Sequence, residues 1–226
     1  MQDLPEGLEK IGKMAFSDCS ISHINISSTV REISPDFVQQ IFYMGGFPWD
    51  YRENNKPAIN ISISNSNTTY ACVDNVVYSK DMKTLYTYFQ NNGYCSKFVV
   101  PETVETIERN AFFYNCGDPI LYGDITFTKN VKNFDLSQFA SSDDGFGSKM
   151  CQGTITIDSP YLYEQLISNP DYKLAFGVGY GKPFDSVNAI KVLKTIDTNT
   201  TNSYFNAEHV KKDTTTDALY NIYTAS

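Results

Sequence analysis

Apolar and polar positions along the chain repeat in one arrangement. Residues 4–16 and 100–112 share the frame apolar-Pro-Glu-x-apolar-Glu-x-Ile-x-x-x-Ala-Phe. Two further stretches, residues 26–38 and 127–139, carry apolar residues at the apolar positions of this frame but match the rest of it less regularly. A repeat this short cannot bury its own apolar face, so neighbouring repeats must stack into one continuous core, as in a solenoid.

Each repeat follows or contains a short run in which apolar and polar residues alternate. Such alternation is typical of a strand with one buried face and one solvent face. We therefore predict five short parallel strands along one face of the stack. The apolar residues that define them are Ile24 and Ile26, Ile59 to Ile63, Phe98 and Val100, Ile125 and Phe127, and Ile155 and Ile157.

An extra segment interrupts the array between the second and third of these strands. Val73 to Val77 and Leu85 to Phe89 are rich in strand-forming residues, and Ser79-Lys80-Asp81 between them favours a turn. The pattern predicts a β-hairpin inserted at about residues 70–92.

The chain changes character after residue 157. Asp158-Ser159-Pro160 is a helix-start signal, and the amphipathic stretch after it would cover the last layer. Val187 to Ile196 predicts a further strand or strand pair, and from Asp197 onwards Thr, Asn and Asp dominate. These features predict a solenoid over 1–157, a C-terminal capping segment over 158–196, and a Thr/Asn-rich extended tail or linker over 197–226.

The frame resembles the repeats of a known family. Pro-x-x-apolar-x-x-Ile-Gly-x-x-Ala-Phe-x-x-Cys is complete from Pro5 to Cys19 and is similar to the BspA-like leucine-rich repeats. Residues 73–85 resemble the hairpin that often interrupts arrays of this family. The resemblance covers about residues 2–157, although the second and fourth repeats lack the Ala-Phe pair and the Cys.

The resemblance implies a fold and a setting. The fold is mainly β with short helical turns: a leucine-rich-repeat solenoid with a parallel strand ladder, the inserted hairpin and a C-terminal cap. Family members are typically surface or secreted proteins implicated in adhesion and host-cell contact. No signal peptide is expected in this chain, because Met1-Gln2-Asp3 runs directly into a repeat.

The start of the array predicts an uncapped end. Leu4, Leu8 and Ile11 would lie at the first layer of the solenoid with nothing before them. We expect these residues to belong to a longer protein, or to self-associate through this end.

Composition narrows the classes of partner. The 226 residues are 41% hydrophobic, enough for a sizeable core, and carry a net charge of −8. An acidic chain without a Lys/Arg cluster is a poor candidate for binding nucleic acid or an anionic membrane. We also expect no membrane span, since no apolar run approaches roughly 20 residues.

Residue sets for catalysis or metal binding are missing from the pattern. His23 and His209 are the only histidines, and carboxylates such as Glu105 and Glu108 lie at outward frame positions. We therefore predict that the protein is not an enzyme and uses no metal or other cofactor.

The five cysteines cannot all pair. Cys19 and Cys116 occupy matching frame positions, where a buried thiol in each layer is expected. Cys72 and Cys95 bracket the inserted hairpin, and their spacing fits either a disulfide or two free thiols.

Two surfaces are candidates for contact with a protein or glycan on a host cell or matrix. One is the polar strand face, which lacks the aromatic and Arg anchors typical of binding hot spots. The other is the excursion at residues 41–51, whose Phe47 and Trp49 either pack into the core or form an exposed aromatic contact site. The strand-face residues chosen as partner-binding candidates are His23, Asn25, Asn60, Ser62, Lys97 and Thr126.

Four asparagines match the acceptor pattern for N-glycosylation, namely Asn25, Asn60, Asn67 and Asn199. Two of them lie on the predicted strand face, where a glycan would crowd a partner. Either those two are unmodified, or recognition uses another surface.

The sequence thus favours a non-catalytic recognition or adhesion module at a cell surface. The alternative is a structural spacer, a stiff repeat array whose faces are only solvated and which has no ligand of its own. The two hypotheses differ in whether substitutions on the strand face abolish binding.

Overall fold

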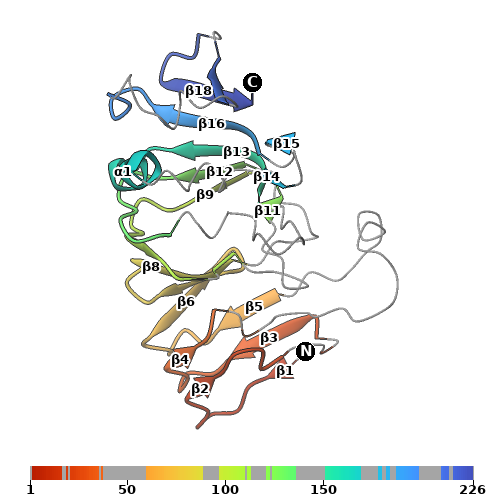
Figure 1. Cartoon of the computed structure of the whole chain (residues 1–226). Helices are drawn as coiled ribbons and strands as arrows, with labels where there is room; N and C mark the ends of the chain where they lie inside the picture. The colour runs from red at the N-terminus through yellow and green to blue at the C-terminus, as the bar shows by residue number, and fades with distance from the viewer. Residues whose placement is uncertain are drawn as a thin grey trace. The chain divides into compact units, whose positions relative to one another are not determined.

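The computed structural model describes residues 2–16, 19, 21–35, 37, 60–88, 97–109, 111–112, 121–122, 124–135, 151–168, 178–179, 182–183, 187–198, 210–213 and 216–225. This described part is mainly β, with one helix, α1 (Pro160–Ser168) (Figure 1). No helix in it is long and apolar enough to cross a membrane. The chain divides into two compact units, unit 1 (Met1–Tyr94 and Ile107–Asp118) and unit 2 (Cys95–Thr106 and Pro119–Ser226).

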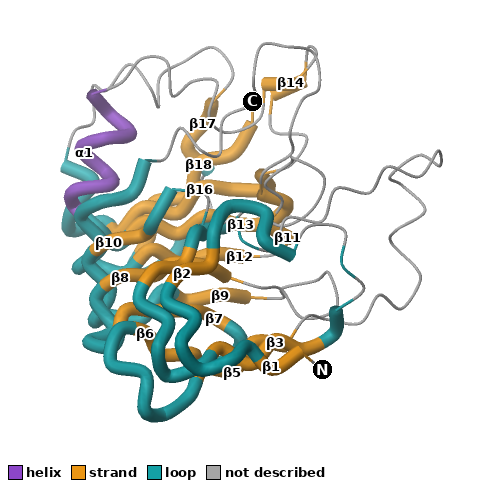
Figure 2. Tube along the Cα trace, turned by 90° about the horizontal axis from the view of Figure 1, so that it is seen from below, coloured by secondary structure: helices purple, strands orange, loops and turns teal. Residues whose placement is uncertain are grey.

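Unit 1 contains two parallel ladders. One runs in the order β1 (Gln2–Asp3), β3 (His23–Ile26), β5 (Asn60–Ile63) (Figure 2), and the other joins β2 (Lys10–Ile11) to β4 (Glu32–Ile33) (Figure 1). In the second ladder Ile11 lies beside Ile33, the residue at the same position of the next repeat. The predicted parallel pairing of neighbouring repeats is therefore confirmed in this unit.

Burial in unit 1 follows the predicted alternation. In β3, Ile24 and Ile26 are fully buried, whereas His23 and Asn25 are partly exposed. Each buried isoleucine removes apolar surface from water, which stabilises the fold by roughly 1.5–3 kcal/mol per side chain. The core residues of this unit are Ile11, Ile24, Ile26, Val30, Ile33, Phe37, Ile61, Tyr70 and Val77.

The Ala-Phe pair of the frame has a different environment in its two complete copies. Ala111 and Phe112 are buried, with 0% and 5% of their surface exposed. Ala15 is exposed, and Phe16 is half-buried with its ring edge on Phe37, 6.2 Å between ring centroids. Cys19 is exposed, so the expected buried thiol at this position is wrong. Cys116 lies outside the described residues.

The predicted hairpin insertion contains one strand more than expected. Antiparallel strands β6 (Tyr70–Val73), β7 (Val76–Ser79) and β8 (Thr84–Tyr88) form a meander. Asp74 and Asn75 link β6 to β7 with φ of 49° and 66°, the left-handed values that a two-residue hairpin turn requires. Val73–Val77 is therefore two strand ends around a turn, not one strand. Next to β8 lies β10 (Thr106–Ile107), and the Glu108 N–H donates to the Leu85 carbonyl oxygen (2.9 Å).

Side chains of this meander cover the outer edge of β5. The Ile61 N–H donates to Asn75 Oδ1 (2.6 Å), and Cys72 Sγ donates to the Ile61 carbonyl oxygen (3.2 Å). Two side chains thus replace the backbone partners that a further parallel strand would supply. Burial raises the pKa of the Cys72 thiol to about 11, so it stays protonated and able to donate at neutral pH. Cys72 is a free thiol, and Cys95 lies outside the described residues.

Unit 2 contains a seven-stranded sheet. Its parallel part runs β9 (Lys97–Val99), β12 (Asp124–Phe127), β13 (Cys151–Ile157), β16 (Val187–Leu193), with β11 (Leu121–Tyr122) also beside β13. A separate antiparallel pair joins β14 (Val178–Gly179) to β15 (Lys182–Pro183). Three of the predicted strands thus pair in parallel here too. The apolar residues of the sheet with no exposed surface are Ile125, Phe127, Ile155, Ile157, Ile190 and Val192.

The predicted helix start at Ser159 is present. Pro160 is the first residue of α1, and Ser159 Oγ accepts a hydrogen bond from the Leu162 N–H (3.2 Å), which caps the first turn. Ser159 Oγ also donates to the Val131 carbonyl oxygen of the preceding repeat. Leu162 and Leu166 have no exposed surface, so the helix buries one apolar face.

Residues 197–226, predicted as an extended tail or linker, contribute two strands. β18 (Tyr220–Ala225) pairs antiparallel with β16, and β17 (Val210–Lys212) pairs with β18. Asp197 fastens β18 from the preceding turn, because its carboxylate accepts from Asn221 Nδ2 (2.6 Å) and from the Tyr223 hydroxyl (2.6 Å). The described part of this segment is packed, although the domain boundaries themselves stay a prediction.

Asp158, at the junction of β13 and α1, is a carboxylate in an unfavourable place. Its Oδ1 is buried without a hydrogen-bond partner among the described residues, and burial raises its pKa. A raised folded-state pKa means that ionisation costs stability as pH rises above the unfolded-state value. We expect Asp158→Asn to stabilise the chain at pH 7 by less than about 1 kcal/mol after solvent screening. The gain should vanish at pH 3 in urea melts; a gain independent of pH would contradict this cause.

Candidate functional site

The strand face of unit 1 is built from three parallel strands in register. Asp3 of β1 lies beside Asn25 of β3, which lies beside Ser62 of β5. His23 of β3 lies beside Asn60 in the same way. Since successive side chains of a strand point to opposite faces, these polar residues share one face while the isoleucines between them fill the core.

Four of these side chains form a continuous chain of hydrogen bonds, which we call the polar row. Asn25 Nδ2 donates to Asp3 Oδ1 (3.2 Å), and Ser62 Oγ donates to Asn25 Oδ1 (3.0 Å). His23 Nε2 lies 3.1 Å from Ser62 Oγ. The polar row therefore links all three strands of the sheet through their side chains.

The direction of each bond in the polar row follows from proton counting. An ionised carboxylate only accepts, so Asn25 must turn its amide nitrogen to Asp3 and its oxygen to Ser62. Ser62 has one hydroxyl proton, which goes to the Asn25 oxygen. The Ser62 oxygen then remains as an acceptor for a proton on Nε2 of His23.

The Ser62 hydroxyl donates to Asn25 Oδ1 in this arrangement. A serine nucleophile instead needs a histidine that accepts the serine proton. The Ser62 proton is thus directed to Asn25 rather than to His23.

Several polar atoms of the row keep the capacity to bind a ligand. Among the described residues, Asp3 Oδ2, the second amide hydrogen of Asn25 and Nδ1 of His23 have no hydrogen-bond partner. Asn60 is exposed beside His23. The face thus offers both acceptors and donors, held in place by bonds within the row. Asp3 was not among the sequence candidates because a two-residue strand shows no alternation.

Asn67, predicted as a glycosylation site, is 1% exposed. Its Nδ2 donates to the Ser27 and Val30 carbonyl oxygens (3.0 Å each), and its Oδ1 accepts from the Thr69 and Tyr70 N–H groups (2.8 Å each). Both amide hydrogens are used inside the fold, so the folded chain has no room for a glycan there. This prediction is not compatible with the structure.

The other sequon residues differ in access. Asn60 is exposed, whereas the amide nitrogen of Asn25 is engaged with Asp3. Asn199 lies outside the described residues. Glycosylation at Asn25 and Asn60 stays a prediction.

The strand face of unit 2 carries the other predicted contact residues. Lys97 is exposed beside Asp124, and Thr126 lies between Val99 and Thr156. Val99 is 47% exposed, and the Thr154 N–H donates to Asp124 Oδ1 (2.7 Å) where the sheet register shifts. Lys97 and Thr126 thus lie on one face of one sheet, as predicted. Phe47 and Trp49 lie outside the described residues.

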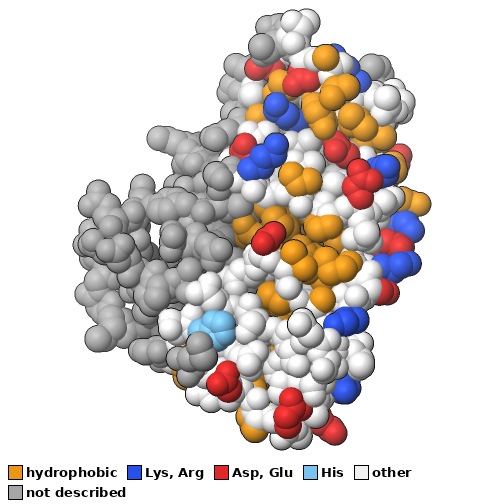
Figure 3. Space-filling model, turned by 180° about the vertical axis from the view of Figure 1, so that it is seen from behind, with side chains coloured by type: hydrophobic (Ala, Val, Ile, Leu, Met, Phe, Trp, Pro, Cys, Tyr) orange, Lys and Arg blue, Asp and Glu red, His pale blue; other side chains and the backbone are white. Residues whose placement is uncertain are grey.

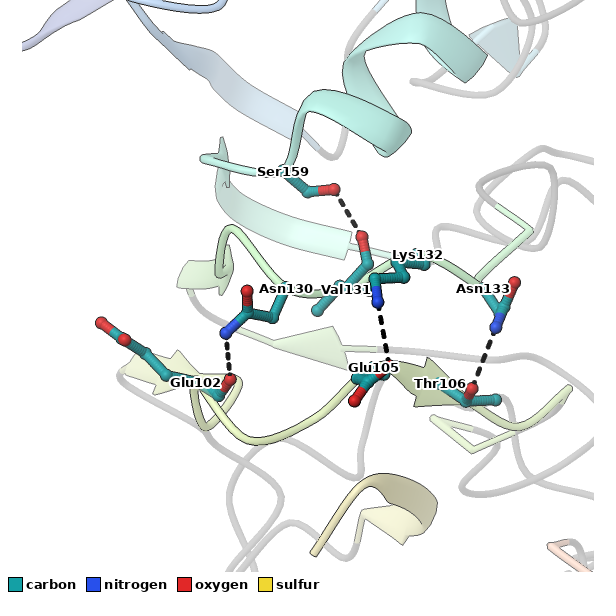
Figure 4. A network of polar contacts seen from close by, with 8 residues as sticks. All are labelled: Glu102, Glu105, Thr106, Asn130, Val131, Lys132, Asn133 and Ser159. Atoms are coloured by element: carbon teal, nitrogen blue, oxygen red, sulfur yellow. Dashed lines mark hydrogen bonds and ion pairs between the residues drawn. The ribbon is translucent and has the colours of Figure 1, made fainter.

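A second polar network lies on the turns that follow the strands of unit 2 (Figure 4). Lys129 pairs with Glu102 (3.3 Å), and Lys132 pairs with Glu105 (3.0 Å). Asn130 Nδ2 adds a bond to the Glu102 carbonyl oxygen (2.6 Å). The two ion pairs join identical frame positions of neighbouring repeats. From the sequence, carboxylates such as Glu105 were expected only to be solvated. Because the side chains of both ion pairs are at least about one third exposed, each pair contributes at most about 1 kcal/mol.

Charge is distributed without a dominant sign on the face drawn in Figure 3. Acidic and basic side chains are interspersed there, and the described atoms drawn next to the histidine are white, the colour of uncharged polar side chains and backbone. Within the described ranges, no group of three or more His, Cys, Asp or Glu side chains could hold a metal ion.

The repeat frame can be compared with known families at this point. Six copies of the BspA type leucine rich repeat match residues 2–43 and 58–145. The chain belongs to this family. The parallel ladders of β1, β3 and β5 and of β9, β12, β13 and β16 include strands of these repeats.

Two solved structures are similar to the chain. A leucine-rich repeat protein from Eubacterium ventriosum is 22% identical, with a TM-score of 0.44, and the match covers 69% of this chain and 35% of that one. The pneumococcal vaccine antigen PcpA is 13% identical, with a TM-score of 0.33, covering 84% of this chain and 62% of that one. The chain thus spans less than two thirds of either protein. A comparison with curated proteins found no match.

Proposed function

We propose that this chain is a non-catalytic recognition or adhesion module. The observation that supports it is the polar row, in which exposed or half-buried side chains from three strands are held in register above the hydrophobic core. A face ordered in this way loses little side-chain entropy when a partner binds. The partner is a protein or a glycan on a cell or matrix surface.

Family membership supports the setting of this proposal. BspA-like proteins are typically found at the surface or secreted, with roles in adhesion and host interaction. We propose the same localisation here, with the repeats stacked as one solenoid over residues 1–157, a cap over 158–196 and the remaining segment beyond it. Self-association through the first repeat belongs to the same proposal.

The test is a capture experiment with matched variants. The chain, displayed in several copies on a bead, should retain material from extracellular-matrix or cell-surface preparations. Per-module affinity should be weak, on the order of micromolar, so multivalent display is required. Asn60→Lys, at an exposed position of β5 outside the polar row, should abolish capture while the thermal melt stays unchanged. Capture of nothing, or capture that survives Asn60→Lys and charge-changing substitutions at Lys97 and Thr126, would contradict the proposal.

A structural spacer is the second candidate, and the turn network favours it. Lys129, Lys132 and Asn130, which follow β12, bind Glu102 and Glu105 of the preceding repeat. In unit 1, Lys10 and Glu32 (2.6 Å) make a similar link. A row of such links resists bending of one repeat against the next. A spacer tolerates charged substitutions on the strand face without any change in binding.

A further inference from the structure

The chemistry of the polar row narrows the class of its partner. The exposed large hydrophobic residues of the described chain are Val73, Val99, Tyr161 and Leu219, and none of them lies on β1, β3 or β5. Protein interfaces draw most of their binding energy from buried aromatic or Arg anchors. The unit 1 face offers hydrogen bonds in their place, which favours a ligand rich in polar groups.

Charge narrows the class further. The strands β1, β3 and β5 carry a single formal charge, the carboxylate of Asp3, and no Lys or Arg. The whole chain has a net charge of −8. An anionic ligand would bring a like charge towards Asp3 with no cation on these strands to offset it. The face therefore suits a neutral ligand.

Donor and acceptor positions match a pair of hydroxyl groups. A hydroxyl can both donate and accept, whereas the Asp3 carboxylate only accepts and the Asn25 amide nitrogen only donates. The two groups are 3.2 Å apart. One hydroxyl of a vicinal diol can donate to Asp3 while its neighbour accepts the second amide hydrogen of Asn25.

Ser62 and His23 fix the orientation of the Asn25 amide beside Asp3. Because Ser62 donates to the Asn25 oxygen, the amide cannot flip without turning its oxygen towards the Asp3 carboxylate. The Asn25 side chain is thus already ordered in the free protein, so binding a ligand costs little additional side-chain entropy, which favours affinity. The bond to a carboxylate is of the stronger, charge-assisted kind.

We propose that the polar row is a binding site for a neutral glycan, whose vicinal hydroxyls bridge Asp3 and Asn25. The proposal rests on the proposed recognition function and assigns its ligand class. Ser62 and His23 act as positioning residues. Glycosylation of Asn25 would consume the amide hydrogen that the ligand needs, so the site requires Asn25 to be unmodified.

The test uses albumin carrying defined glycans as the probe. Conjugates of glucose, galactose, mannose or lactose are compared with a sialylated conjugate and with bare albumin, against the chain in multivalent display. We expect binding to at least one neutral conjugate. Asp3→Asn, which keeps the size of the side chain, should weaken it about tenfold or more, as expected for loss of a charged hydrogen bond. Gln2→Ala, the exposed neighbour on β1, should leave it unchanged.

A second variant and a chemical treatment of the captured material complete the test. Asn25→Leu should abolish binding, and if that variant fails to fold, the exposed Asp3→Asn carries the test alone. Binding to no neutral conjugate, binding that needs sialic acid, or binding insensitive to Asp3→Asn overturns the proposal. In the capture experiment, periodate cleaves vicinal diols and should abolish retention. Retention that survives periodate but is lost after protease treatment overturns the glycan site while leaving the recognition function standing.

Discussion

Phe112→Ala should lower the free energy of unfolding by about 3–5 kcal/mol, the range for removing a buried aromatic side chain. Phe112 is 5% exposed and lies against Tyr88, 5.8 Å between ring centroids. Its backbone neighbour Ala111 accepts from the Tyr88 N–H (2.8 Å), so the segment is tied to β8 and cannot easily close the cavity. Denaturant melts measure the change.

Thr126→Ala is the matched control for this prediction. Thr126 is half-buried on the strand face of unit 2, and its change should cost less than about 0.5 kcal/mol. Equal losses at Phe112 and Thr126 would show that the inward and outward positions of the repeat frame are assigned incorrectly.

The alternation of apolar and polar residues predicted the parallel strands because it reflects which side chains of a strand are buried and which are exposed. The strands β3, β5, β9, β12 and β13 carry most of the predicted isoleucine and phenylalanine residues, although Val100 follows β9 and Ile59 lies outside the described residues. Ile125 and Ile155 face one another in register with no exposed surface. The same signal placed His23, Asn25 and Ser62 outwards, so most of the polar row could be predicted as a face. Its bond directions could not, since they depend on Asp3, which lies in a two-residue strand.

Other features left no periodic trace in the sequence. The turn at Asp74-Asn75 interrupts a run of valines that is typical of one strand, because Asp and Asn are among the few residues that tolerate left-handed φ. β18 lies in a Thr/Asn-rich segment, and it is fastened by hydrogen bonds to Asp197 rather than by apolar periodicity. Polar fastening of this kind depends on three-dimensional contacts, which composition does not record.

Asn67 is the clearest example of a three-dimensional contact that the sequence pattern did not predict. Its sequon predicted a solvent-exposed acceptor, yet its amide satisfies four backbone groups, two of them about 40 residues earlier in the chain. The carbonyls of Ser27 and Val30 lie in the turn between β3 and β4, outside both strands. The buried amide has two N–H donors and one oxygen that accepts two hydrogen bonds, so it pairs with all four backbone groups.

Asn67→Asp should therefore be among the most destabilising single changes in the chain. The substitution keeps the shape but replaces both donors with oxygen, which places a carboxylate against the Ser27 and Val30 carbonyl oxygens. A buried charge without compensation costs about 3–5 kcal/mol. Asn65→Asp, exposed in the same turn, should change stability by less than about 0.5 kcal/mol.

The pH dependence of Asn67→Asp identifies the cause. Burial beside carbonyl oxygens raises the pKa of the new carboxyl in the folded state above the value of about 3.9 in the unfolded chain. The charge penalty is then absent below the unfolded-state pKa and grows as pH rises through it. Urea melts at pH 3 and pH 7 should show a smaller loss in acid, where the protonated carboxyl can still donate one hydrogen bond. A loss that is the same at both pH values would mean that the missing donor, rather than the buried charge, sets the cost.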